Sequence, residues 1–193
     1  LTLARLLGEP HVVWFGDPGS EDASVLAEYG ASAVHVVKGQ DMADHPVVPM
    51  VDVLQALVSE LDATAVLVPS SADGKEAAGR LAVRIGSGVI TDAVDISESG
   101  VATQSVFGGS TVVHSMVTHG IGIYTVRPNS VAPESAPTTC TVVDVDATAS
   151  EAAKTARVVE RTVAGKDGRP ELTEAAVVVS GGRGVGGSEG FEV

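Results

Sequence analysis

Short apolar runs alternate with segments of helical periodicity through the first 86 residues of the chain. The apolar runs have the length of buried strands and are flanked by turn-forming residues; they cover residues 12–15, 34–37 and 65–69. The helical segments follow these runs and cover residues 22–29, 49–61 and 73–85. Strands that alternate with helices are typical of a parallel sheet with right-handed crossovers. This half of the chain is therefore predicted to form a mostly parallel, Rossmann-like α/β sheet.

Two of the helical segments carry well-defined apolar faces. Residues 49–61 have an apolar stripe at helical spacing, made of Met50, Val53, Leu54, Leu57, Val58 and Leu61. The inward face of residues 73–85 consists of Ala78, Leu81, Ala82 and Ile85. Because this second face is mostly alanine, we expect its helix to lie close to the sheet.

The pattern changes to closely spaced strands after Gly86. Strand-like runs cover residues 89–96, 101–107, 111–117, 121–126 and 141–145, and residues 158–163 could form one more. Short turns rich in Gly and Ser separate most of them, which favours antiparallel or mixed strands added to the sheet. Residues 129–139 contain two prolines and are predicted to form a loop.

A second break predicts the domain organisation. Residues 166–170 are a polar stretch with Gly and Pro, typical of a linker. We therefore predict an α/β domain over residues 1–165, a linker over 166–174 and the start of another domain over 175–193. That last part would hold a buried strand, residues 175–179, and a glycine-rich turn.

The composition excludes several classes of protein. Acidic residues outnumber basic ones by 25 to 12 among 193 residues, and the formal net charge of −13 argues against binding to nucleic-acid phosphates. One cysteine cannot form an internal disulfide framework. No apolar segment is long enough for membrane insertion, and residues 1–5 have no signal-peptide pattern. The expectation is a soluble, cytoplasmic protein.

The glycine-rich turn is the first candidate site. Gly182, Gly184 and Gly187 fit the G-x-G-x-x-G pattern directly after the predicted strand. Such a turn lets backbone N–H groups approach a phosphate, although it is also compatible with an ordinary tight strand-to-helix connection. Arg183 favours the first interpretation, because its planar guanidinium suits a phosphate or an electron-rich ring.

The second candidate site runs from Pro69 to Lys75, at the carboxyl end of a predicted strand. Ligands of doubly wound folds bind at this end, so Ser70, Ser71 or Asp73 could hold a nucleotide. The same residue types cap helices, and Asp73 followed by Glu76 has the spacing of a capping box. The capping interpretation is favoured.

The remaining reactive residue types predict no further site. His114 and His119 are five residues apart, and the other three histidines, His11, His35 and His45, lie near separate elements, so no pair has metal-ligand spacing. Cys140 is most simply an idle or buried thiol. The chain has no G-x-S-x-G elbow for a nucleophilic serine.

Several segments together carry a family resemblance. They cover residues 72–86, 89–95, 107–109, 124–128, 171–175 and 178–186, and include the sequences TVRP at 125–128 and SGGRG at 180–184. Spread from end to end of the chain, they resemble the electron transfer flavoprotein alpha subunit. The matching part is the N-terminal domain without its first strand, followed by the start of the FAD-binding domain.

The resemblance implies an electron carrier without catalytic turnover of its own. Members pair with a beta subunit, hold FAD and carry electrons from dehydrogenases, such as acyl-CoA dehydrogenases, to a quinone oxidoreductase or an equivalent acceptor. This chain would supply mainly the scaffold of the heterodimer. Arg183 matches the arginine of the family's FAD-contacting loop, and Gly182 and Gly184 match its glycines. A nucleotide-binding α/β domain that uses residues 69–75 is the alternative.

Overall fold

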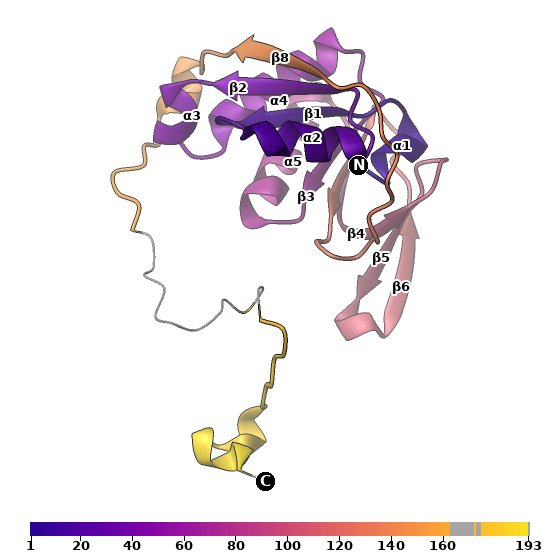
Figure 1. Ribbon diagram of the computed structural model, residues 1–193, viewed down its shortest axis with the longest axis vertical. Helices are drawn as coiled ribbons and strands as arrows, with labels where there is room; N and C mark the ends of the chain where they lie inside the picture. The colour runs from indigo at the N-terminus through magenta and orange to yellow at the C-terminus, as the bar shows by residue number, and fades with distance from the viewer. Residues whose placement is uncertain (163–171, 173–174, 193) are drawn as a thin grey trace. The chain divides into compact units, whose positions relative to one another are not determined.

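Two hydrogen-bonded sheets organise the larger of the two units into which the chain divides (Figure 1). The computed structural model describes residues 1–162, 172 and 175–192. The larger unit covers Leu1–Val159 and the smaller one Glu160–Val193. The helices of the larger unit are α1 (Ala4–Leu7), α2 (Ser20–Glu28), α3 (Gln40–Asp44), α4 (Val48–Glu60) and α5 (Ala72–Ile85).

The strands of the larger unit are β1 (His11–Phe15), β2 (Ala33–Lys38), β3 (Ala65–Pro69), β4 (Val89–Ile96), β5 (Ala102–Val106), β6 (Thr111–Ser115), β7 (Gly122–Val126) and β8 (Thr141–Asp146). Sheet A contains β1, β2 and β8 in that order, all parallel. Sheet B has the order β3-β7-β4-β5-β6. The first three strands of sheet B are parallel, whereas β5 and β6 are antiparallel to their neighbours.

This topology confirms the predicted Rossmann-like α/β fold, with one refinement. The mixed strands of the second half of the chain do not simply extend one sheet. Strand β8 returns to sheet A beside β2, whereas β7 enters sheet B between β3 and β4. Figure 1 shows the β5–β6 hairpin extending away from the rest of the larger unit.

Helices cover both faces of sheet A. Consecutive residues of β2 alternate between the two faces, and Val34, Val36 and Val37 are all essentially inaccessible to solvent. Helix α4 packs on one face through Val53 and Leu57, which contact Val37. Figure 1 shows α2 on the other side of the sheet.

The main core lies between helices α4 and α5 and sheet B. Its buried residues are Val47, Val51, Leu54, Ala77, Ala78, Leu81, Ala82 and Ile123. The alanine-rich face of α5 is buried as expected, and Ile85 packs at its margin. A second cluster on β4, β5, β7 and the N-terminal segment contains Leu3, Ile90, Ala93, Ile96, Ala102 and Tyr124. Within the described residues, no helix combines the length and the apolar character that crossing a bilayer requires.

Two predicted strands are not formed. Residues 158–162 are irregular, and Val163 lies outside the described residues. Residues 175–179 make no strand pairing either, and Val177, Val178 and Val179 are 80%, 52% and 76% exposed. The physical reason is that a strand needs a neighbour for its backbone groups, and no described segment pairs with this one. The predicted linker at 166–174 lies outside the described residues except for Leu172.

Candidate functional site

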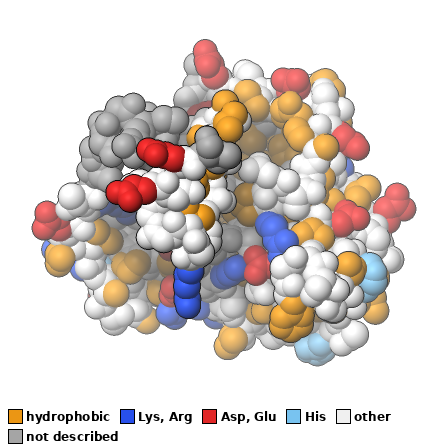
Figure 2. Space-filling model, turned by 90° about the horizontal axis from the view of Figure 1, so that it is seen from below, with side chains coloured by type: hydrophobic (Ala, Val, Ile, Leu, Met, Phe, Trp, Pro, Cys, Tyr) orange, Lys and Arg blue, Asp and Glu red, His pale blue; other side chains and the backbone are white. Residues whose placement is uncertain are grey.

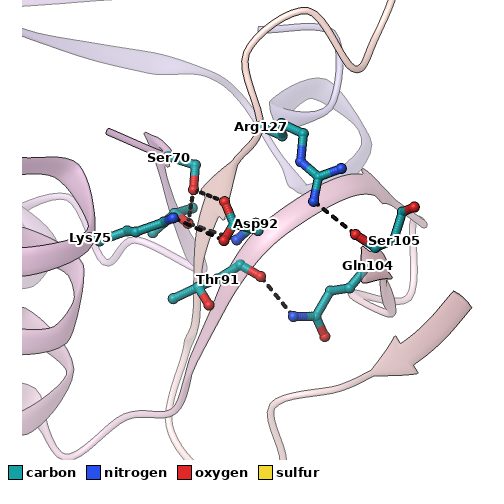
Figure 3. A network of polar contacts seen from close by, with 8 residues as sticks. Ser70, Lys75, Thr91, Asp92, Gln104, Ser105 and Arg127 are labelled. Atoms are coloured by element: carbon teal, nitrogen blue, oxygen red, sulfur yellow. Dashed lines mark hydrogen bonds and ion pairs between the residues drawn. The ribbon is translucent and has the colours of Figure 1, made fainter. Parts of the chain in front are cut away.

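Three segments that the sequence singled out meet at the carboxyl edge of sheet B (Figure 3). Strands β3, β7 and β4 are parallel neighbours, so their carboxyl ends lie together. Ser70 follows β3, Thr125 lies near the end of β7, and Asp92 lies within β4. Lys75 approaches them from the first turns of α5. We call Ser70, Lys75, Asp92 and Thr125 the carboxyl-edge cluster.

Asp92 is the centre of this cluster. Its Oδ1 accepts a hydrogen bond of 2.5 Å from the Ser70 hydroxyl, and its Oδ2 lies 2.9 Å from the Lys75 Nζ. The hydrogen bond from Ser70 and then the one from Lys75 lower the pKa of the Asp92 carboxyl from its usual value. Asp92 is therefore an ionised acceptor at neutral pH.

The cluster closes into a ring of hydrogen bonds. The Asp92 backbone N–H donates to the Thr125 Oγ1 at 2.9 Å, and the Ser70 Oγ lies 2.9 Å from the same Oγ1. Each hydroxyl has a single proton, and that of Ser70 is used on the Asp92 carboxylate. Thr125 must then donate to Ser70, so donors and acceptors run in one direction around the ring. Thr125 is 0% exposed, and the ring satisfies its buried hydroxyl.

A bulge in β4 makes this ring possible. The register between β4 and β7 shifts between Ile90 and Ala93, and Asp92 has a φ of +56°. Aspartate tolerates this left-handed conformation better than most residues. The bulge turns the Asp92 carboxylate towards Ser70 and Lys75, which sequence periodicity could not have predicted.

The N-terminus of α5 confirms the capping interpretation, with Ser71 as the cap. The helix begins at Ala72, and the Ser71 hydroxyl accepts a hydrogen bond of 3.0 Å from the Gly74 N–H. The capping-box spacing of Asp73 and Glu76 is not used, because Asp73 lies inside the first turn. Gly74 is required by close packing, since a Cβ there would lie 2.0 Å from the Pro69 carbonyl oxygen.

Further hydrogen bonds connect the same edge to the β5–β6 hairpin. The Arg127 Nη2 donates to the Ser105 carbonyl at 2.9 Å, and the Gln104 Nε2 donates to the Thr91 carbonyl at 2.7 Å. Figure 3 shows both bonds beside the cluster. The charge of Arg127 also contributes to the low pKa of Asp92. The hydrogen bonds at this edge thus fix the orientation of the hairpin relative to β4.

The contacts of the carboxyl-edge cluster favour a structural role over a catalytic one. The Ser70 hydroxyl donates to a carboxylate, Ser71 caps a helix, and Lys75 forms an ion pair. A nucleophilic serine needs a base strong enough to take its proton during attack, and the lowered pKa of Asp92 makes its carboxylate a weak base. Figure 2 shows acidic side chains spread singly over the drawn face, as is usual for a solvated acidic surface.

A pair of histidines is the feature that sequence reasoning missed. His11 on β1 and His35 on β2 were expected near separate elements, but the parallel register places Val13 opposite His35 and brings the two rings together. The His11 Nδ1 lies 3.0 Å from the His35 Nε2, and the ring centroids are 5.2 Å apart. Burial, and then the charge of His11, lower the pKa of His35, while Glu60 opposes the shift. The described residues contain no group of three or more His, Cys, Asp or Glu side chains that could hold a metal ion.

The glycine-rich segment lies in the smaller unit and forms two short 3₁₀ turns, Arg183–Val185 and Ser188–Phe191. A Cβ at Gly182 or Gly184 would meet nothing within 4 Å, so these glycines leave open space beside the backbone. The Arg183 carbonyl accepts a hydrogen bond of 3.2 Å from the Gly186 N–H, whereas the Arg183 guanidinium has no hydrogen-bond or ion-pair partner among the described residues. Free guanidinium donors beside an open glycine backbone fit a phosphate or a flavin ring.

The comparisons with known proteins agree on one family. A model of the electron transfer flavoprotein domain matches residues 1–165. A protein named electron transfer flavoprotein subunit alpha from Mycobacterium leprae is 42% identical over 195 residues, which cover 100% of this chain and 61% of that protein. A protein of the same name from Syntrophomonas wolfei is 33% identical, covering 100% of this chain and 62% of that protein.

More distant relatives carry a second name. Protein FixB of Clostridium saccharobutylicum is 29% identical over 177 residues, which cover 87% of this chain and 52% of that protein. The chain thus spans about three fifths of the length of the more similar relatives.

Proposed function

Because this chain belongs to the electron transfer flavoprotein family, we propose that it acts as the alpha subunit of a flavoprotein that carries electrons from dehydrogenases to an acceptor. The match of the family model over residues 1–165 carries this proposal. Acyl-CoA dehydrogenases are the proposed donors, and a quinone oxidoreductase or an equivalent protein is the proposed acceptor. The protein would work in the cytoplasm as an electron carrier and not as an enzyme.

The larger unit would serve as the scaffold of a heterodimer with a beta subunit. Its carboxyl edge, where many α/β proteins bind a ligand, is occupied by the ring of Ser70, Asp92 and Thr125. Because Asp92 is engaged in that ring, we assign it no role in a reaction. Its role is to hold β3, β4 and β7 in register. This favours a structural role for residues 1–159.

The smaller unit would contribute to FAD binding. Gly182 and Gly184 would let the cofactor approach the backbone, and Arg183 would offset negative charge on the pyrophosphate or on the reduced ring. Bound FAD would supply the electron-accepting and electron-donating chemistry. The residues of this chain would bind and orient the cofactor.

Substitution of Arg183 in the complete heterodimer tests this proposal. The wild-type pair is expected to co-purify with bound FAD and to show a flavin spectrum, and Arg183→Ala is expected to retain FAD at least about tenfold less tightly, because a charge-assisted contact is lost. Arg157→Ala is the matched control, since Arg157 is 71% exposed and makes only a 4.0 Å ion pair with Asp44. Retention of FAD by Arg183→Ala equal to that of the control would reject the site. A colourless wild-type protein that binds no beta subunit would reject the function.

No second function is proposed. Nucleotide binding by residues 69–75 would need free donors at the carboxyl edge. Ser70, Ser71 and Lys75 are instead engaged with Asp92 and Gly74.

A further inference from the structure

Residues 149–158 follow β8 and lie against helices α3 and α4 (Figure 1). This segment, which we call the strap, contains the 3₁₀ turn Glu151–Lys154 and is otherwise irregular. We propose that the strap is an electrostatic latch that opens and closes while the rest of the larger unit stays folded. Its closure fixes the point at which the chain leaves the larger unit on its way to the smaller one.

The start of the strap is bound by two carboxylates. The Ser150 N–H donates to the Asp52 Oδ2 on α4 at 2.9 Å. The Ala149 N–H donates to the Asp41 Oδ2 on α3 at 3.4 Å, and the Lys154 Nζ lies 3.2 Å from the same oxygen. The hydrogen bond from Lys154 lowers the pKa of the Asp41 carboxyl, whereas burial opposes the shift. Closure of the strap therefore favours the ionised form of Asp41.

The end of the strap is bound at α3. The Val158 N–H donates to the Asp44 carbonyl at 2.8 Å, and the Arg157 Nη2 lies 4.0 Å from the Asp44 Oδ2. The His45 Nδ1 lies 2.6 Å from the Ala156 carbonyl oxygen. Because a carbonyl only accepts, this ring nitrogen is the donor. The strap is therefore held at both ends by polar contacts with α3, α4 and the residue that follows α3.

Apolar burial contributes little to holding the strap. Its buried side chains are Ala149 and Ala153, which are 4% and 1% exposed and carry a single methyl group each. The side chains of Lys154 and Arg157 are 30% and 71% exposed, so dissolved salt screens their ion pairs. Segments with few buried apolar contacts open at a lower free energy than the core. The strap is therefore expected to open before the rest of the unit, and more often as the salt concentration rises.

The charges of the strap and of the helices beneath it are complementary. Residues 39–74, which include α3 and α4, contain no Lys or Arg. The cations that pair with the aspartates of these helices come from other segments: Lys154 and Arg157 from the strap, and Arg84 from α5. An open strap withdraws two of these three cations. Attraction between the acidic helices and the strap therefore favours reclosure.

Opening changes the length of chain between the two units. The strap ends just before Val159, the last residue of the larger unit. Once open, residues 149–158 join the segment that leads to the smaller unit, and they lengthen it by at most about 35 Å when fully extended. The latch therefore sets the length of that segment.

Hydrogen exchange of individual amides in the full chain tests the proposal. The Ser150 and Val158 amides report on the two ends of the strap, and the Val36 amide in the central strand of sheet A reports on unfolding of the whole unit. In wild type, the two strap amides are expected to exchange at least about 100-fold faster than the Val36 amide, yet more slowly than in an unstructured chain. Raising KCl from about 50 mM to about 500 mM is expected to speed exchange of the strap amides about fivefold and to leave the Val36 amide unchanged.

Asp41→Asn and Lys154→Met remove one charge from either side of the latch. Asparagine keeps a hydrogen-bond acceptor, and methionine keeps an unbranched side chain. Each variant is expected to speed exchange of the Ser150 amide about fivefold at low salt and to reduce the effect of added salt. Glu76→Gln is the control, because it removes a carboxylate from an ion pair with Arg80 that lies within α5.

Three results would overturn the latch. Strap amides that exchange no faster than the Val36 amide would mean that the strap opens only when the whole unit unfolds. Strap amides that exchange as fast as an unstructured chain at low salt would mean that the strap does not close. Local opening that neither salt nor the two variants change would mean that packing, and not charge, holds the strap. None of these measurements depends on FAD or on a beta subunit, so the proposed function is tested separately.

Discussion

Replacement of Asp92 by Asn isolates the charge at the centre of the carboxyl-edge cluster. Asparagine has nearly the same shape, accepts a hydrogen bond from Ser70 and tolerates the φ of +56°. What the variant loses is the negative charge that faces Lys75 at 2.9 Å and strengthens the bond from Ser70. Hydrogen bonds to charged groups contribute about 1.5–3 kcal/mol, whereas exposed ion pairs contribute about 0–1 kcal/mol.

The partial exposure of the pair sets the expected magnitude. The side chains of Lys75 and Asp92 are 41% and 38% exposed, so solvent screens part of their attraction. The expected loss of unfolding free energy is about 1 kcal/mol at pH 7, measured by urea denaturation. Asp144→Asn is the control, because its pair with Lys38 is 73% and 57% exposed and is expected to contribute less than about 0.5 kcal/mol.

The pH dependence gives a sharper test than the magnitude. The pKa of Asp92 is lowered in the folded chain, so its contribution is complete above the unfolded pKa of about 3.9 and is lost as the pH falls through the folded pKa. The difference between wild type and Asp92→Asn is therefore expected to be constant from pH 7 to about 5 and to shrink below that. Equal stability at pH 7, or a gap that does not change in acid, would refute the assigned role of the carboxylate.

Two further predictions concern the core and the histidine pair. Leu81→Ala is expected to lower the unfolding free energy by about 3 kcal/mol in the same urea assay, because Leu81 is 0% exposed between α5 and sheet B, whereas Val83→Ala on the same helix should change it by less than about 0.5 kcal/mol. A loss at Leu81 no greater than at Val83 would contradict the packing of α5. The pKa of His35 is lowered in the folded chain, so its contribution to stability is complete above the unfolded pKa of about 6.5 and is lost as the pH falls through the folded pKa. His35→Gln is expected to make the melting temperature depend less on pH between about pH 7.5 and 5.5. An unchanged slope of melting temperature against pH would contradict the lowered pKa assigned to His35.

Local periodicity was sufficient to predict most elements of the larger unit. The helices expected at 49–61 and 73–85 differ from α4 and α5 by one residue at most at either end, because each has a continuous apolar face that only a helix can bury. Helix α3 was not predicted, since five residues are too few to show a period. The strand expected at 175–179 was predicted but is not formed. An apolar run shows that its residues favour a strand, but a strand also requires a neighbouring strand with which to pair.

The contacts within the candidate sites could not be predicted in the same way. The segments that contain Asp92 and Arg127 were singled out, but the ring of hydrogen bonds depends on a bulge in β4 that periodicity does not reveal. The contact between His11 and His35 depends on the register of two parallel strands joined through α2. Register is set by pairing across the sheet and not by any local property of the segment between the two histidines, which are 24 positions apart.

The closed ring at the carboxyl edge of sheet B pairs with one another the polar groups that Rossmann-like folds commonly direct at a ligand. An open edge would leave the Thr125 hydroxyl and the Asp92 N–H free to meet a ligand, whereas here each satisfies another member of the ring. The same edge fixes the β5–β6 hairpin through Arg127, and that hairpin carries the exposed Phe107. Residues at an edge that holds a small molecule in many α/β proteins therefore connect strands and position a hairpin in this one. It follows that substitutions in the ring should lower the unfolding free energy of the larger unit, whereas substitutions at Arg183 should affect FAD retention alone.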